Sequence, residues 1–352
     1  MIHAHAGDAG AVSTRALSIL LAIAVLVSLC TAYRVFWRGG GGKLVIYCAH
    51  DSIHSEAVIR KFETATGIPV SIRFDAEATK SLGLVELLMR ERSNPRCDVF
   101  WNNQVLGTEF LKEEDLLLPY KGSGYQRIPE TFKDPGGRWA GFAARLRVYI
   151  INTDQVAAEE NAVLQALEGD LTRVAVARPL YGTTLTHYAA LWDQWGKDRL
   201  VAWHEDWHRR GVREVPGNAA VKALVAEGIC SVGLTDTDDF FAALDAGKPV
   251  AMVPVRMESG AVICIPNSVA IIKGTCRLES AKKLVDFLLS ASTEVMLATS
   301  RSRQIPLGPT KTHRLPAEVK AMQKLVRLSL PLRPLARARS ECLSWLKSKA
   351  IR

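Results

Sequence analysis

Short apolar runs alternate with longer amphipathic segments in the first part of the chain. Residues 44–47, 70–74 and 97–101 are continuously apolar or alternate in polarity, as strands do. Between them, residues 55–66 and 82–92 carry apolar side chains at helical spacing, and Gly67 ends the first of these helices. Strands that alternate with helices over short links predict an α/β fold with a mostly parallel sheet.

The same alternation returns after a gap, which predicts a second α/β unit. Strands are expected at residues 148–151, 174–177 and 231–234, and helices at 187–195, 199–210, 219–227 and 280–290. Residues 262–272 read as extended chain, interrupted at Pro266. Polar segments follow four of the predicted strands, at residues 49–52, 75–80, 102–104 and 235–239. Because ligands bind at the carboxyl ends of parallel strands, these segments predict one converging site.

The N-terminal segment is apolar. Residues 16–33 contain no charged side chain, a length between that of a signal-peptide core and a short transmembrane helix. Residues 1–42 are therefore predicted to be a signal peptide or an N-terminal membrane anchor, followed by a glycine linker at residues 39–42. Either alternative places the body of the protein outside the cytoplasm, and the residues do not decide between them.

Composition narrows the function classes. With 352 residues, 48% of them hydrophobic and 23% charged, the chain is globular. The formal charge of +9 resides in residues 311–352, which hold 11 basic and 2 acidic side chains and are predicted to form helices packed on the body. Since the body itself is balanced, we expect no nucleic-acid partner. The seven cysteines form no CxxC pair, and their disulfide pairing cannot be read from spacing.

Several stretches, in order, resemble extracellular solute-binding proteins of family 1, in the branch of the periplasmic ferric-ion-binding proteins. They include Leu44–Tyr47, Phe62–Val70, Asp98–Asn103, Gly141–Arg145, Tyr181–Thr184, Val232–Asp239, Ile265–Ala270 and Ser302–Leu307. The resemblance implies the type II periplasmic-binding-protein fold, with two lobes that enclose a ligand cleft. Residues 43–142 and 260–310 would form lobe 1, residues 143–259 lobe 2, and residues 311–352 the outer helices.

The resemblance also implies a function. The protein would be the monomeric, periplasmic substrate-binding subunit of an ABC importer, docking on a membrane permease and performing no chemistry. A membrane-anchored sensor with the same fold is the alternative. An enzyme is less favoured, because GxSxG, HExxH, GxxxxGK[ST] and GxGxxG motifs are absent from the sequence. His204 and His208 have the spacing of two metal ligands on a helix, but we interpret them as part of a solvent-exposed helix face.

The ferric branch uses two adjacent tyrosines after the Val-Gly-Leu strand, and here Asp238 and Asp239 occupy those positions. A histidine that ligates iron in some relatives falls near His50 or Asp51. No cofactor is required, but Fe³⁺ with a synergistic anion stays possible, with Asp238 and Asp239 as tentative metal ligands. The acidic candidates for the ligand site are Asp51, Glu77, Asp236 and Asp238. Helix capping is the structural alternative for Asp236 and Asp239.

Other candidates suit an anion. Alternation places Arg145 and Arg147 on one strand face. The resemblance implies that an arginine here faces the cleft and binds an anion, and the alternative is that one of the two forms a structural ion pair. Thr183 and Thr184 precede a helix expected to start near Thr186, so they form an anion pocket or an ordinary cap. Asn102 and Asn103 end a strand and bind an oxygen-rich ligand or the loop backbone. Together these groups suit a metal–anion pair, a zwitterion or a phosphorylated solute, and the sequence does not name which.

Overall fold

The computed structural model describes residues 42–75, 82–310 and 314–350. From Leu44 onward the chain forms one unit of its own. The predicted N-terminal signal or anchor falls on residues 1–42, almost entirely outside the described residues. Within the described residues, no helix combines the length and the apolar character needed to cross a membrane.

The first α/β unit forms as the polarity pattern predicts. β1 (Leu44–Cys48) is almost wholly buried and pairs in parallel with β2 (Val70–Phe74) and β3 (Val99–Asn102). α2 (Ser52–Thr66) buries Ser55, Val58, Ile59 and Phe62, which lie on one helical face. Gly67 ends it at φ +69°, and its N–H donates to the carbonyl of Glu63.

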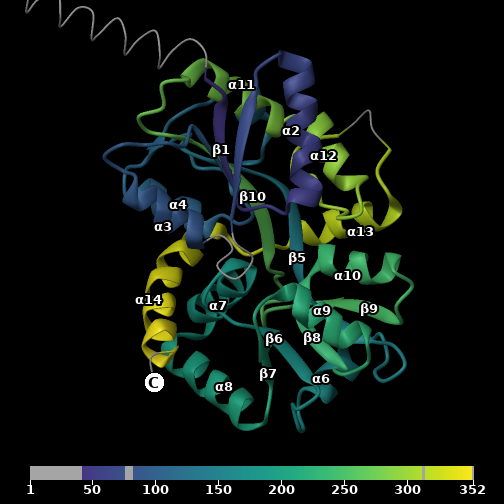
Figure 1. Ribbon diagram of the computed structural model, residues 1–352. Helices are drawn as coiled ribbons and strands as arrows, with labels where there is room; N and C mark the ends of the chain where they lie inside the picture. The colour runs from purple at the N-terminus through teal and green to yellow at the C-terminus, as the bar shows by residue number, and fades with distance from the viewer. Residues whose placement is uncertain (1–41, 76–81, 311–313, 351–352) are drawn as a thin grey trace, which may run out of the picture. The chain divides into compact units, whose positions relative to one another are not determined.

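One long strand, β5 (Ala140–Asn152), belongs to both halves of the sheet (Figure 1). Through Ala140–Leu146 it pairs antiparallel with β10 (Cys264–Ile272), and through Arg147–Asn152 with β8 and β9. The strand order is β2-β1-β3-β10-β5-β8-β6-β7, with β4 paired to β10 and β9 to β5. We call the part built around β2, β1, β3, β10 and β4 lobe 1, and the part around β8, β6, β7 and β9 lobe 2. The finer domain boundaries stay a prediction.

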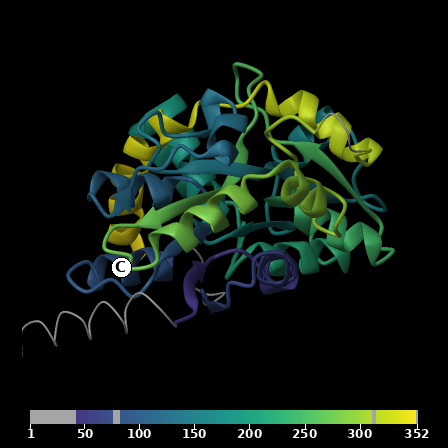
Figure 2. The same ribbon diagram turned by 90° about the horizontal axis from the view of Figure 1, so that it is seen from above.

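Helices flank the sheet of each lobe (Figure 1, Figure 2). The remaining elements of lobe 1 are β4 (Leu117–Leu118), α3 (Leu82–Arg90), α4 (Leu106–Glu113), α5 (Ser123–Arg127), η2 (Glu130–Phe132), α11 (Leu278–Leu288) and α12 (Ala291–Ala298). Those of lobe 2 are β6 (Val174–Ala177), β7 (Arg213–Val215), β8 (Val232–Asp236), β9 (Val250–Pro254), α6 (Glu160–Ala166), α7 (Gly182–Trp195), α8 (Lys197–Arg209), α9 (Asn218–Ala226) and α10 (Thr237–Asp245).

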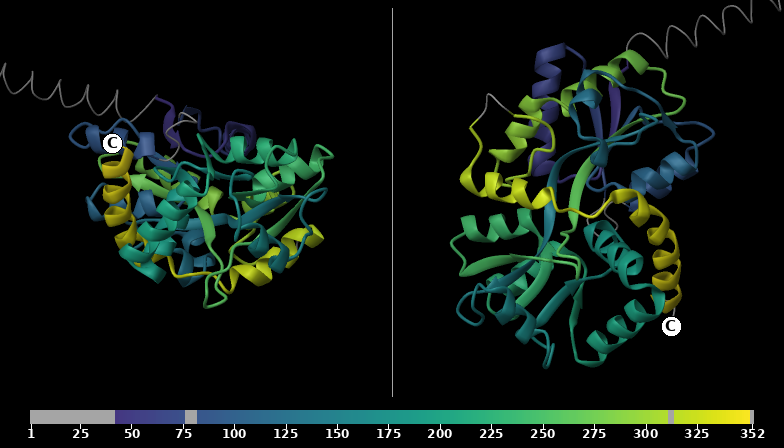
Figure 3. Two further views of the ribbon diagram at one scale, coloured as in Figure 1. Left: turned by 90° about the horizontal axis from the view of Figure 1, so that it is seen from below. Right: turned by 180° about the vertical axis from the view of Figure 1, so that it is seen from behind.

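The basic C-terminal residues form α13 (Ala317–Val326) and α14 (Leu332–Ala350), as expected. α14 runs beside α7 of lobe 2 and also touches α4 of lobe 1 (Figure 3). It buries Leu335, Cys342 and Leu346 against lobe 2. α14 is thus amphipathic: its apolar face belongs to the core, while basic side chains such as Arg333 and Arg337 are exposed.

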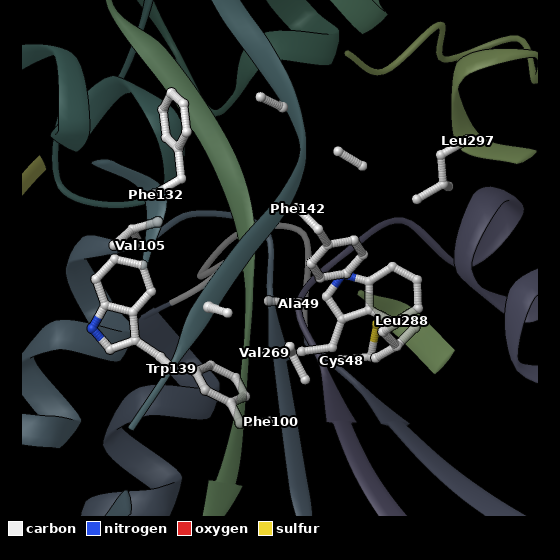
Figure 4. Close-up of a cluster of buried hydrophobic side chains, with 14 of the residues drawn as sticks. Cys48, Ala49, Phe100, Val105, Phe132, Trp139, Phe142, Val269, Leu288 and Leu297 are labelled. Atoms are coloured by element: carbon white, nitrogen blue, oxygen red, sulfur yellow. The ribbon is translucent and has the colours of Figure 1, made fainter. Parts of the chain in front are cut away.

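Two clusters of buried side chains hold the unit together. The larger one fills lobe 1 and continues to α9 and α10, and Figure 4 shows members of it, among them Phe100, Trp139 and Phe142. The second lies between the sheet of lobe 2 and the helices α7, α8 and α14. Five of the cysteines are buried free thiols in these clusters, and Cys276 is an exposed free thiol.

Candidate ligand-binding site

The two arginines of β5 lie on the same strand face, as the alternation predicts, at the point where the strand passes between the lobes. Arg147 is fully buried. Its Nη1 donates to Asp236 Oδ1 at 2.7 Å and to Thr183 Oγ1 at 3.3 Å, and lies 3.4 Å from Asn218 Oδ1. Arg147 thereby links β5, β8 and the starts of α7 and α9. Of the two roles expected for these arginines, anion binding or a structural ion pair, Arg147 has the structural ion pair, with Asp236.

Asp236 does not cap α10, although it occupies the N-cap position. One carboxylate oxygen accepts from Arg147, and the other accepts from Asn218 Nδ2 at 3.1 Å. Asn218 Nδ2 also donates to Thr183 Oγ1 at 2.9 Å. The capping alternative for Asp236 is therefore wrong, because its carboxylate pairs with the buried guanidinium of Arg147, its register partner on the adjacent strand β5.

Arg145 lies two residues nearer to lobe 1 and borders a pocket. Its Nη2 donates to the carbonyl oxygen of Asn103, while Nη1 lies 3.6 Å from Asp238 Oδ2 and 4.0 Å from Asp236 Oδ2. Its Nε is buried with no hydrogen-bond partner among the described residues. Burial alone would lower the pKa of Arg145, but the neighbouring carboxylates raise the pKa above its usual value. The guanidinium is thus permanently charged at the pocket wall.

Two helices begin at this pocket with unused backbone donors. The first hydrogen bond inside α7 runs from Leu185 N to Tyr181 O, so the preceding amides of the first turn have no acceptor within the helix. Gly182 opens α7 with φ +61°, a conformation that favours glycine. The helix begins at Gly182, not near Thr186 as expected, which places Thr183 and Thr184 in its first turn. α9 likewise starts at the pocket, with Asn218 as its first residue.

The acids after β8 also differ from the expected loop, because α10 already begins at Thr237. Asp238 and Asp239 occupy its first turn, where the helix dipole favours carboxylates. Asp239 Oδ2 accepts from Thr235 Oγ1 at 2.8 Å, and its Oδ1 lies 3.8 Å from Lys222 Nζ. Burial and repulsion from Asp238 and Asp236 raise the pKa of Asp239 to about 7.

Lobe 1 contributes fewer groups. Asp51 precedes α2 and lines the pocket, and so does Asn103 after β3. The buried His50 ring lies behind this wall and does not line it: Nδ1 accepts from the N–H of Asp51 at 2.7 Å, and Nε2 lies 2.6 Å from Gln304 Nε2. Asn102 points into the core, where Nδ2 donates to Thr108 Oγ1 at 3.2 Å.

These groups surround one pocket of about 760 Å³. Of the predicted ligand residues, the structure brings seven to its wall: Asp51, Asn103, Arg145, Thr183, Thr184, Asp236 and Asp238. His50, Asn102 and Arg147 lie behind that wall, and Glu77 lies outside the described residues. Asp239, predicted as a tentative metal ligand, also lines the pocket.

Sequence reasoning missed several lining residues, above all Asn218 and Lys222, together with Arg178, Tyr181, Asp245 and Arg301. Gly217-Asn218 at the start of a predicted helix has the same pattern as Gly182-Thr183, so that signal could have found Asn218. No sequence pattern around Arg178 or Arg301 indicates that these residues line a pocket. In the described part of the chain, no three His, Cys, Asp or Glu side chains are arranged to hold a metal ion.

No protein-family model matches the chain. Among curated proteins, Iron uptake protein A1 of Synechocystis sp. is 24% identical over 254 residues, which cover 68% of each chain. The Probable ABC transporter periplasmic-binding protein y4fP of Sinorhizobium fredii is 27% identical over 254 residues, 69% of each chain. These relatives agree with the resemblance seen in the sequence.

Solved structures match over most of the chain. Iron-bound HitA from Pseudomonas aeruginosa has a TM-score of 0.74 at 20% identity, covering 88% of this chain and 99% of that one. The periplasmic binding protein AfuA from Actinobacillus pleuropneumoniae, with exogenous fructose-6-phosphate bound, has a TM-score of 0.69 at 20% identity, covering 88% and 98%. The chain has the fold of the two-lobed periplasmic binding proteins. In this binding-protein fold, β5 is a strand that joins the lobes, and the pocket lies beside it.

Proposed function

We propose that this protein is the extracytoplasmic substrate-binding subunit of an ABC importer and that its cargo is a small organic solute with a phosphate or phosphonate group. The curated relatives with a stated role are uptake and ABC binding proteins, which favours transport over the alternative of a membrane-anchored sensor. A membrane permease is the partner that this role requires.

The observation that carries the choice of cargo is the convergence of Arg145 with the starts of α7 and α9. A buried guanidinium with an unpartnered Nε, the Thr183 hydroxyl, which only accepts hydrogen bonds within the protein, and unused helix amides are donors for one oxyanion. The pocket of about 760 Å³ falls in the range of sites for organic ligands and far exceeds the volume of one metal ion.

Ferric iron is the competing cargo, because six of the similar proteins are named or described as binding iron. The donor set of this chain does not favour it. Asp238 and Asp239 stand where the ferric-binding resemblance places tyrosines, and both carboxylates already face a cation of the protein. His50, a further candidate for iron, is engaged behind the wall.

Thermal unfolding of the purified protein against a ligand panel tests the proposal. The panel holds phosphate esters, phosphonates, inorganic phosphate, and ferric iron with carbonate or phosphate. A ligand at 100 times its Kd adds about 2.7 kcal/mol to the free energy of unfolding, which raises Tm by several degrees. We expect that rise with a phosphate ester or phosphonate, its loss in Arg145→Met, and its retention in Arg256→Met, a control outside the pocket.

Two results would contradict the proposal. A rise with ferric iron that disappears when Asp238 and Asp239 become alanine would make the protein a metal receptor. A panel in which no oxyanion raises Tm would remove the support for an organic-anion cargo.

A further inference from the structure

The C-terminal helix α14 connects the two lobes outside the ligand pocket. It packs along α7 of lobe 2 and also touches α4 of lobe 1 (Figure 3), and none of its described residues lines the pocket. The helix α4 begins shortly after Asn103, and α7 begins at Gly182, so both neighbours of α14 start at a wall of the pocket. A movement that separates these two walls must therefore change the contact of α14 with at least one of the two helices.

The contact of α14 with lobe 2 is apolar and buried. Leu335, Cys342 and Leu346 belong to the buried cluster that α14 shares with α7, α8 and the sheet of lobe 2. Trp192 Nε1 of α7 also donates to Glu341 Oε2 of α14 at 3.2 Å. Because separation would expose this apolar surface to water, we expect α14 to stay on lobe 2 when the lobes move.

The contact with lobe 1 is of another kind, because it buries a cation. The guanidinium carbon of Arg339 lies 5.4 Å from the centroid of the Phe110 ring of α4, and Arg339 is only 5% exposed. Its Nε has no hydrogen-bond partner, and no carboxylate in the described part of the chain forms an ion pair with it. Burial lowers the pKa of Arg339, although the charge of Glu113 acts in the opposite direction.

The forces across this contact therefore oppose one another. Leu106 of α4 belongs to the apolar cluster of lobe 2 and favours the contact. A buried cation without a paired carboxylate costs free energy, and its attraction to the Phe110 ring offsets only a part of that cost. The remaining ion pair, Lys347 with Glu86 of α3, is exposed, so solvent screens it.

We propose that α14 is an additional connection between the lobes, fixed to lobe 2 and separable from α4, and that Arg339 keeps this contact weak enough to open when the lobes move. Separation from α4 returns water to the Arg339 guanidinium, so the charge that the contact buries favours the separated state. The ligand-free protein then populates two lobe arrangements of similar free energy. This inference goes beyond the proposed function, because it concerns the motion of the lobes and requires no particular cargo.

Pulsed electron paramagnetic resonance on the full protein without ligand tests the proposal. Spin labels are attached at Ala65→Cys of α2 and Gln165→Cys of α6, two exposed positions in different lobes. Cys276→Ser removes the exposed native thiol, Cys30→Ser removes the thiol outside the described residues, and the other native thiols are buried. With α14 unaltered we expect two interlobe distances, one of which matches the lobe arrangement of the structure.

The variant Arg339→Met removes the buried charge and keeps an apolar side chain of similar length against Phe110. It should stabilise the contact of α14 with α4, so the population at the second distance should fall about tenfold. Arg337→Met is the matched control, because Arg337 lies on the same helix and is exposed. This control loses the same charge without a change at the contact, and both populations should stay as they are.

Several results would overturn the proposal. A single interlobe distance with α14 unaltered would show that the contact does not separate. An unchanged or larger second population in Arg339→Met, or a lower melting temperature of that variant, would show that Arg339 does not weaken the contact. An equal shift in Arg337→Met would assign the effect to the charge of α14 in general. Since no ligand is present, these results do not bear on the cargo, and a failure of the ligand panel would leave them unaffected.

Discussion

The surroundings of Arg145 and Arg147 differ, although the two residues are alike, two positions apart and on the same face of β5. Arg147 has a carboxylate at 2.7 Å and contacts two further side chains through Nη1, while its Nε and Nη2 are buried without a hydrogen-bond partner among the described residues. Arg145 has its carboxylates at the longer distances of 3.6 and 4.0 Å, and it lines the pocket, which Arg147 does not. The tightly paired arginine organises the wall, and the loosely paired one is available to a ligand.

This comparison teaches how one strand serves both fold and function. A guanidinium in a close ion pair has little to gain from an added anion, whereas one held at longer distances does. Position along β5 explains why the two ion pairs differ. Arg147 lies where the strand joins the sheet of lobe 2, and Arg145 lies where the strand leaves lobe 1.

Arg147→Met should have the largest effect on stability. It leaves Asp236 buried without its cation, and removal of one partner from a buried ion pair costs about 3–5 kcal/mol. Chemical denaturation monitored by circular dichroism measures the loss of unfolding free energy. Arg199→Met is the control, because Arg199 and its partner Glu258 are both exposed and solvent screens their ion pair, and we expect little or no change. An equal loss in both variants would contradict the structural role given to Arg147.

The two regions should also differ in how stability depends on pH. Burial, with the charge of Arg147 as a second cause, lowers the pKa of His187 from 6.5 to about 3. Below about pH 6.5 the unfolded chain binds a proton that folded His187 does not, so stability falls as pH decreases toward 3. The slope is roughly 1.4 kcal/mol per pH unit inside that window. Asp239 has the opposite sign: its raised pKa of about 7 makes stability fall as pH rises from 3.8 to 7.

Variants separate these two contributions. Denaturation of His187→Gln at several pH values between 4.5 and 6.5 should show a weaker loss of stability in acid than the unaltered protein shows. Asp239→Asn should show a weaker loss as pH rises toward 7. If either variant keeps the unaltered slope, the assignment of that slope to its residue is wrong.

Much of the fold could be predicted from the sequence, because its signals are local. Apolar runs predicted β1, β3 and β8, and the helical stripe predicted the buried face of α2. Period-two alternation also placed Arg145 and Arg147 on one face. The starts of α7 and α10 were placed too late, since their polar first turns border a pocket and lack the apolar pattern of a buried helix.

The site was less predictable because its contacts join distant segments. Asp236 looked like a helix cap, but its cation lies 89 positions away on another strand. The direction of the His50 ring depends on Gln304, 254 positions away. The sequence near these residues does not indicate either partner. Local patterns could therefore name candidate residues, but they could not distinguish residues that line the pocket from residues that support it from behind.

A crystal structure with the tightest-binding phosphate or phosphonate of the ligand panel tests the central claim most directly. We predict that oxygens of the oxyanion lie within hydrogen-bonding distance of the Arg145 guanidinium and of the first-turn amides of α7, while the contact between Arg147 and Asp236 stays unchanged. A ligand whose oxyanion lies elsewhere, or one that binds Arg147 in place of Arg145, would contradict the account.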